Sequence, residues 1–281
     1  MSTLDATVTA DAWDAIAPRY DQHVTPTANF EVAETALERV DVGPPTDLLD
    51  VACGSGALAI PAARRGARVL GVDFAPTMVA RLEARARAEG LDDVRARVMD
   101  GHDLDLDDDT FDVVASQFGV MLFPDQPRAL REMVRVTKPG GQVLVVAYRP
   151  PEEVEFLTFF LGAVQAVVPG FEGPPPDEPM LPFQAADPEV LRGRLEEAGL
   201  RDVTIEQNVE TLEFASGQQL WDWMMSSNPI PGALTAELTD EQRGQVREVL
   251  DRMLRERGGG HLPATITAGL NIATGTKPPH P

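Results

Sequence analysis

The chain has 281 residues, and 24 lysine and arginine residues against 45 aspartate and glutamate residues give it a formal net charge of −21. Such a surface repels the phosphate backbone of nucleic acids and the head groups of anionic lipids, so we expect neither as a partner. The sequence has no apolar run of the roughly 20 residues that a membrane span needs, no signal-peptide pattern, and a single cysteine, Cys53, so we expect a cytoplasmic protein without intrachain disulfides.

The most informative segment reads LLDVACGSG and covers residues 48–56. It predicts a buried strand that ends near Asp50, a turn permitted by Gly54 and Gly56, and a following alanine-rich helix. Strand, glycine turn and helix together typically bind a nucleotide-like ligand. Dehydrogenases use the same glycine spacing, but a carboxylate beside the turn would repel a pyrophosphate and attract a cationic sulfonium and ammonium ligand.

Further apolar strands follow, and several end in a polar side chain. RVLGVDF (68–74) ends in Asp73, which can accept hydrogen bonds from both hydroxyls of a ribose, and VRARVMDG (94–101) presents Asp100 to an adenine amine. A fourth strand ends near Ser116 and Gln117, and KPGGQVLVVAY (138–148) supplies a fifth. Open α/β sheets bind ligands at this carboxyl edge of their strands.

The second half of the chain alternates helices and strands differently. An apolar helix at 154–168 precedes a proline-rich loop, GPPPDEP (173–179), and a surface helix that begins after Asp187. A long alternating strand at 203–214 and a last strand at 264–277 enclose two more predicted helices, the second of which begins at Thr239 or Asp240.

These motifs together resemble the class I S-adenosylmethionine-dependent methyltransferases, in the branch of the ubiquinone and menaquinone methyltransferases. The resemblance covers Trp13 to Tyr148 and includes the segment WDAIAPRYDQH before the first strand. It implies an α/β, Rossmann-like fold: a seven-stranded, mostly parallel sheet in the order 3-2-1-4-5-7-6, with the seventh strand antiparallel, helices on both faces and an added helical lid. The expected division is a cofactor-binding core at 1–150, a lid helix and proline-rich loop at 151–186, and completion of the sheet at 187–281 with a second lid insertion at about 215–262.

The resemblance also assigns roles to single residues. It implies S-adenosyl-L-methionine as the cofactor, with the residues that match the family's binding motifs as its contacts: Tyr20, Asp50, Ala52, Gly54, Gly56, Asp73, Phe74, Met78, Asp100, Gly101, Ser116 and Gln117. Tyr20 would close over the reacting methyl group. We expect no metal, because the acidic run DLDLDDD (103–109) lacks the glycine and glutamate of a calcium loop and the histidines are not clustered.

The sequence departs from the family where a histidine pair commonly precedes a phenylalanine-proline-aspartate segment. Met121 and Leu122 occupy those places, so no general base is inherited there. His23 shares a segment with Tyr20 and is our candidate base, with a surface histidine as the competing interpretation. A base is needed only if the acceptor must lose a proton.

Large apolar side chains in the two predicted lid segments indicate the acceptor. Phe156 and Phe160 share one helical face, whereas Trp221 and Trp223 are two positions apart, so we expect at least one tryptophan to face the cleft. We predict O- or C-methylation of a small hydrophobic or aromatic metabolite, admitted past the loop at 173–179. The alternatives are an NAD-dependent oxidoreductase and a non-catalytic S-adenosylmethionine-binding protein, and the protein is either a monomer or a homodimer.

Overall fold

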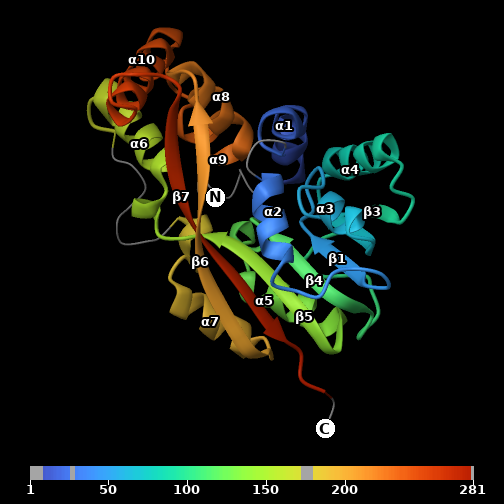
Figure 1. Cartoon of the computed structure of the whole chain (residues 1–281). Helices are drawn as coiled ribbons and strands as arrows, with labels where there is room; N and C mark the ends of the chain where they lie inside the picture. Colours follow the sequence, from blue (N-terminus) through green and yellow to red (C-terminus); the bar gives the residue numbers. More distant parts are fainter. Residues whose placement is uncertain (1–8, 26–28, 172–179, 280–281) are drawn as a thin grey trace.

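The computed structural model describes residues 9–25, 29–171 and 180–279, and the proline-rich loop at 173–179 lies outside them. The chain forms one seven-stranded sheet in the order β3-β2-β1-β4-β5-β7-β6 (Figure 1). Strands β1 to β5 pair in parallel, whereas β7 is antiparallel to both β5 and β6. The predicted fold class and strand order are therefore confirmed.

The strands are β1 (Asp47–Val51), β2 (Arg68–Asp73), β3 (Val94–Val98), β4 (Phe111–Gln117), β5 (Thr137–Tyr148), β6 (Arg201–Phe214) and β7 (Ala264–Thr276). The helices are α1 (Ala10–His23), α2 (Phe30–Leu37), α3 (Ala59–Arg64), α4 (Pro76–Glu89), α5 (Gln126–Val136), α6 (Glu155–Val167), α7 (Pro188–Glu197), α8 (Gly217–Ser227), α9 (Pro229–Leu234) and α10 (Asp240–Arg257). Among the described residues, no helix is both long and apolar enough to cross a membrane.

The sheet is covered by helices on both faces, and adjacent residues of β1 pack against opposite layers. Leu48 and Leu49 of β1 are both fully buried, but Leu48 packs with residues of α2, α3 and α4 while Leu49 packs with residues of α5 and α7. Successive side chains of a strand point to opposite faces, so a strand buried on both sides can carry apolar residues in succession.

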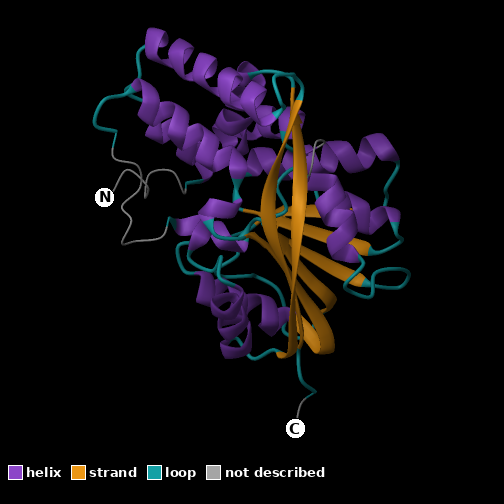
Figure 2. Cartoon of the chain, turned by 60° about the vertical axis from the view of Figure 1, so that its left-hand side comes forward, coloured by secondary structure: helices purple, strands orange, loops and turns teal. Residues whose placement is uncertain are grey.

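A separate apolar cluster lies over the long ends of β6 and β7, where α6, α8 and α10 pack together (Figure 2). Phe160, Leu220 and Leu250 from these three helices are all fully buried in it. Helices α8, α9 and α10 come between β6 and β7 in the chain, and α1 contacts both α8 and α4. This helical layer therefore lies next to the N-terminal helix α1.

Helix α4 receives its N-terminal cap from another helix. Ala75 at the N-cap has no side chain that can accept a hydrogen bond, but the backbone N–H of Thr77 donates to Asp14 of α1 with an N···O distance of 2.7 Å. Asp21 of α1 also forms ion pairs with Arg81 and Arg85 of α4. Partial burial would raise the pKa of Asp21, but the two arginines outweigh it and lower that pKa. Helix α1 is thus fastened to α4 at both ends.

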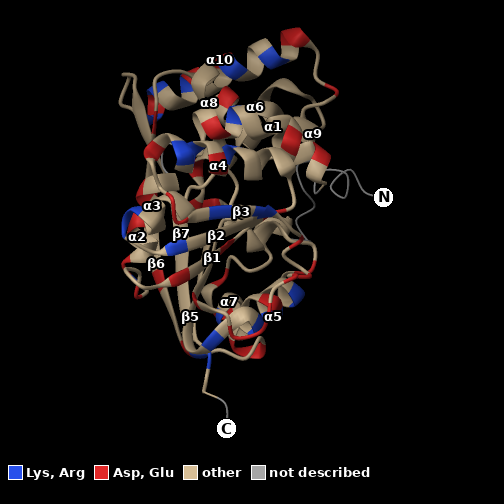
Figure 3. Ribbon diagram, turned by 90° about the vertical axis from the view of Figure 1, so that its right-hand side faces the viewer, with Lys and Arg blue, Asp and Glu red and all other residues tan. Residues whose placement is uncertain are grey.

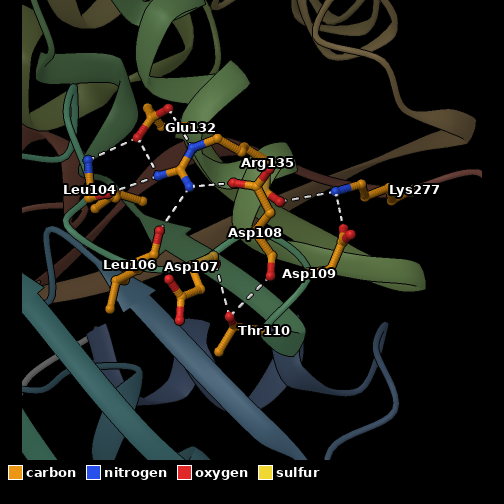
Figure 4. Close-up of polar contacts among 9 residues, drawn as sticks. All are labelled: Leu104, Leu106, Asp107, Asp108, Asp109, Thr110, Glu132, Arg135 and Lys277. Atoms are coloured by element: carbon orange, nitrogen blue, oxygen red, sulfur yellow. Dashed lines mark hydrogen bonds and ion pairs between the residues drawn. The ribbon is translucent and has the colours of Figure 1, made fainter.

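The acidic run between β3 and β4 is neutralised by basic side chains of the protein (Figure 4). Arg135 donates to the carbonyl oxygens of Leu104 and Leu106 and pairs with Asp108, while Lys277 pairs with Asp109 at 2.6 Å. No group of side chains suited to a metal ion occurs among residues 9–25, 29–171 and 180–279.

Candidate functional site

The glycine loop after β1 is held by its own backbone and by β2. The N–H of Cys53 donates to the carbonyl of Val72, and Ala52, Gly54 and Gly56 have φ values of 58°, 53° and 99°. A Cβ at Gly56 would lie 2.6 Å from a methyl carbon of Leu82, so this glycine is required by packing against α4. Gly54 faces Tyr20 instead, with its Cβ position 3.6 Å from the tyrosine ring.

Asp50 lies beneath this loop and does not line the ligand cavity. Its side chain is 1% exposed, and one carboxylate oxygen accepts a hydrogen bond from the N–H of Ala59, the first residue of α3, at 3.0 Å. Burial raises its pKa to about 8, so the carboxyl group is largely neutral at pH 7. Asp50 therefore anchors the loop to the helix, and the structure does not support the direct cofactor contact that we predicted for it.

Asp73 ends β2 at the wall of the cavity. Its two oxygens accept hydrogen bonds from the N–H groups of Gly54 and Ala75, both at 2.9 Å. Burial raises its pKa to about 6, against the effect of these backbone donors. The residue thereby connects the glycine loop to the start of α4, and it faces the cavity where a ribose was predicted.

Asp100 follows β3 and interacts with a histidine that the sequence analysis did not assign to the site. One Asp100 oxygen contacts both the backbone N–H and the ring Nδ1 of His102, at 2.9 and 2.8 Å. The His102 ring in turn packs on Phe123, with 4.8 Å between centroids. Burial would raise the pKa of Asp100, but its bonds to His102 lower it overall, so the side chain stays ionised near neutrality.

These residues enclose a cavity of about 890 Å³ at the carboxyl edge of β1, β2, β3 and β4. Nine of the predicted cofactor residues line it: Tyr20, Ala52, Gly54, Asp73, Phe74, Met78, Asp100, Gly101 and Gln117. Three others do not, namely Asp50, Gly56 and Ser116. Ser116 is fully buried and supports the loop from below, because its hydroxyl donates to the carbonyl of Val51 and accepts from the N–H of Val120.

The cavity carries polar groups that suit an adenosine and an amino-acid cation. Asp73 and Asp100 offer carboxylate oxygens, and the Oε1 of Gln117 is buried without a hydrogen-bond partner among the described residues. A buried acceptor of this kind costs stability unless a ligand supplies a donor. The residues present therefore fit the cofactor that the sequence motifs indicate.

A second cavity of about 820 Å³ adjoins the first. Four residues line both cavities, namely Trp13, Tyr20, Phe118 and Leu122. We call the first the cofactor cavity and the second the acceptor cavity. The acceptor cavity is lined mainly by aromatic and aliphatic side chains of α6, α8 and the segment around Met180. The hydroxyl of Tyr20 at the shared wall accepts a hydrogen bond from Asn29 at 3.2 Å.

Three of the four predicted acceptor contacts line this cavity. Phe156 and Phe160 come from α6, and Trp223 comes from α8 with its ring centroid 4.9 Å from that of Phe156. Trp221 is a correction to our prediction, because it is also only 6% exposed but packs on Phe160 outside the lining. At least one tryptophan does face the cleft, and it is Trp223.

The predicted base does not face either cavity. His23 is half-buried at the end of α1 and lies outside both linings, so the structure gives no support for its role as a base. Met121 and Leu122, where the family resemblance led us to look for a histidine pair, line the acceptor cavity as apolar side chains.

Most of the apolar wall was not predicted from the sequence. Trp13, Phe118 and Tyr148 line the cavities but were not expected there, although Trp13 and Tyr148 mark the two ends of the segment that carried the resemblance. Trp13 was detectable, since it shares its motif with Tyr20, and the two ring centroids are 6.2 Å apart. Phe118 follows β4 and Tyr148 ends β5, and neither carries a sequence signal of its own.

Comparison with known proteins identifies the class to which this fold and this pair of cavities belong. A family model described as "Methyltransferase domain" matches residues 49–145. The demethylmenaquinone methyltransferase of Thermus thermophilus is 36% identical over 163 residues, which cover 56% of this chain and 74% of the relative. The chain therefore belongs to the class I S-adenosylmethionine-dependent methyltransferases.

Other comparisons agree on the fold. Nocamycin O-methyltransferase of Saccharothrix syringae is 40% identical over 123 residues, 43% of this chain and 44% of the relative. The chain spans less than half the length of several curated relatives that it matches, 39% in three further cases. The crystal structure of YcgJ from Bacillus subtilis superimposes with a TM-score of 0.59 at 18% identity, covering 89% of this chain and 99% of that one.

Proposed function

We propose that the protein transfers the methyl group of S-adenosylmethionine to an oxygen or carbon atom of a small, flat, apolar molecule. The observation that carries the proposal is the wall of Trp13, Tyr20, Phe118 and Leu122, which is common to a polar and an apolar cavity. A donor and an acceptor bound in the two cavities would meet at this wall.

Methyl transfer requires little of the protein beyond the positioning of cofactor and acceptor. The cofactor supplies an activated methyl group whose leaving group is a neutral thioether. Tyr20, Asp73, Asp100 and Gln117 would hold it, and the apolar residues around Trp223 would orient the acceptor and exclude water. Holding the reacting atoms about 3–3.5 Å apart and in line accounts for much of the rate gain in reactions of this kind.

The first test is a cofactor-consumption assay with a panel of quinols, phenols, keto acids and amines. We expect turnover of quinols or phenols and none of amines. A thermal shift with S-adenosylhomocysteine and none with NAD would distinguish the family's cofactor from the oxidoreductase alternative. Tight cofactor binding without turnover of any acceptor would instead favour a non-catalytic cofactor-binding protein.

The two tryptophans of α8 provide a matched pair for the acceptor cavity. Trp223→Leu should raise KM for the acceptor about tenfold, because it removes an aromatic surface from the lining. Trp221→Leu should leave KM nearly unchanged, because Trp221 packs on Phe160 outside the cavity. Equal KM values for both variants and the wild type would refute the assignment of this cavity to the acceptor.

A further inference from the structure

A buried carboxylate that the proposed mechanism does not use lies behind the acceptor cavity. Glu210 on β6 is 6% exposed, and one of its oxygens accepts a hydrogen bond from the Tyr148 hydroxyl at 3.2 Å. Its other oxygen is buried and has no partner among the described residues. Burying an ionised carboxylate with one oxygen unpaired is unfavourable, so this environment favours the protonated form. Burial raises the pKa of Glu210 to about 7.

Tyr148 connects this carboxylate to the acceptor cavity. It ends β5, lines the cavity, and stacks on Phe118 with 4.7 Å between ring centroids. Phe118 lines both cavities, so Tyr148 lies directly behind the wall where the two meet. Burial and the neighbouring charge of Glu210 raise the pKa of Tyr148 well above its usual range. Tyr148 is therefore neutral near pH 7. It can relay a proton only if it releases its own hydroxyl proton while it accepts another.

Glu210 is also one of the residues that line a groove on the surface. The groove lies between α2 and the pair β6–β7, and its lining includes Glu31, Val209 and Thr211, which are exposed, together with Glu210 itself. Glu210 thus stands between the acceptor cavity, reached through Tyr148, and a groove that is open to solvent.

The titratable groups around Glu210 come from three elements. Tyr148 belongs to β5, Tyr20 to α1, and Glu31 of α2 lies at the groove. Strand β7, which pairs with β6 here, places Ala268 opposite Glu210 and contributes no charge. The described part of the chain therefore supplies no cation that would hold Glu210 permanently ionised.

We propose that Tyr148 and Glu210 form a proton relay that removes the proton of the acceptor's hydroxyl group during methyl transfer. This inference rests on the proposed function. Transfer breaks the bond between methyl and sulfur and forms one between methyl and the acceptor oxygen. The acceptor's proton passes to the Tyr148 oxygen while the Tyr148 proton passes to the Glu210 carboxylate. The resulting carboxylic acid then returns its proton to water in the groove.

The relay gives the acceptor cavity a base although no histidine occurs in its described lining. His23 lines neither cavity, and His102 lines only the cofactor cavity, where its ring contacts Asp100. The Tyr20 hydroxyl accepts from Asn29, whereas the Tyr148 hydroxyl donates to a carboxylate. A substrate class follows: acceptors that carry an ionisable hydroxyl group, such as phenols and quinols.

The kinetic test compares Glu210→Gln with Glu213→Gln, the same change at an exposed position of the same strand. With the best phenolic acceptor of the panel, wild-type kcat should rise with pH through about 7, because the carboxylate must be ionised to accept a proton. Glu210→Gln should lose this rise and lower kcat at pH 7.5 at least tenfold, since general bases contribute about 10²–10⁴-fold. Tyr148→Phe should do the same, and the double variant should be no slower than either single one.

Affinity for S-adenosylhomocysteine should stay within twofold in these variants, which shows that the fold and the cofactor cavity are intact. Unchanged kcat and an unchanged pH profile in Glu210→Gln would overturn the relay. If that variant does not fold, Tyr148→Phe carries the same comparison.

A second measurement needs no acceptor. Carbon-13 NMR of the side-chain carboxyls in glutamate-labelled protein identifies Glu210 as the signal missing from Glu210→Gln. Its titration midpoint should lie near 7 and move upward in Tyr148→Phe, because that variant removes the donor that stabilises the ionised form. A midpoint at the usual glutamate value of about 4.3 would overturn the relay. If the panel contains no acceptor, the proposed function fails while this titration still decides whether Tyr148 and Glu210 are coupled.

Discussion

Asp73 combines two tasks in one carboxylate, because it fixes the glycine loop and faces the cofactor cavity. Asp73→Asn keeps a hydrogen-bond acceptor but removes the charge, and it should weaken binding of S-adenosylhomocysteine at least tenfold, about 1.4 kcal/mol or more. Calorimetry measures this change. Glu83→Gln, an exposed carboxylate on α4, is the control and should bind like the wild type.

The pH dependence of the same affinity gives an independent check. Burial raises the pKa of Asp73 from 3.8 to about 6, so the neutral form prevails below pH 6 and is the poorer acceptor for hydroxyl donors. The wild-type affinity should therefore fall as the pH is lowered from 7 to 5, while that of Asp73→Asn stays flat. Parallel curves for both proteins would assign the effect to another group.

Tyr20 at the shared wall should act on turnover more than on binding. Burial, with the nearby charge of Asp73, raises the pKa of its hydroxyl well above the usual value, so the group is neutral and serves as a hydrogen-bonding surface beside the reacting atoms. Tyr20→Phe should lower kcat about tenfold and change the cofactor Kd less than threefold. A loss in Kd as large as the loss in kcat would contradict this role.

Helix α1 is held over the cofactor cavity by contacts that replace a missing cap. Asp14→Ala leaves the N–H of Thr77 without an acceptor and should destabilise the fold by about 1 kcal/mol, the usual value of an N-cap. Because α1 carries Trp13 and Tyr20, cofactor affinity should fall as well. Thermal melts and calorimetry measure both effects. Asp11→Ala, in the exposed first turn of α1, should change neither.

At the scale of elements, the sequence allowed us to predict site residues at strand ends. It did not reveal contacts between residues that are far apart in the chain. Asp73 and Asp100 could be predicted to line the cavity because one ends β2 and the other follows β3, and parallel strands bring their carboxyl ends to one edge. Tyr148 and Glu210 lie 62 positions apart, and only the pairing of β5, β7 and β6 brings them together. For Asp50, sequence position does not show whether the carboxylate points into the cavity or beneath the loop, and the structure places it beneath the loop.

The direction in which a side chain points from a helix could not be predicted from the sequence either. Trp221 and Trp223 are similarly buried, but only Trp223 reaches the acceptor cavity, because the neighbours of α8 differ on its two sides. Those neighbours are α6, α10 and α1, whose placement depends on tertiary contacts. The apolar wall of the site therefore depends on how these helices pack together rather than on any one segment.

The net charge of −21 affects the stability of the whole molecule. Figure 3 shows acidic residues on loops and helices of both ends of the protein, interspersed with fewer basic ones. Mutual repulsion among these charges disfavours the compact state, and salt screens this repulsion because the Debye length falls from about 10 Å at 0.1 M to about 3 Å at 1 M.

Raising NaCl from 0.05 to 1 M at pH 7.5 should therefore increase Tm, by about 3–6 °C for a gain of roughly 1–2 kcal/mol in the free energy of unfolding. The same change at pH 4.5, the isoelectric point of the sequence, should have little effect because the net charge there is near zero. A Tm that is insensitive to salt at pH 7.5 would show that the ion pairs on the surface, such as Arg39 with Glu206, already compensate the repulsion.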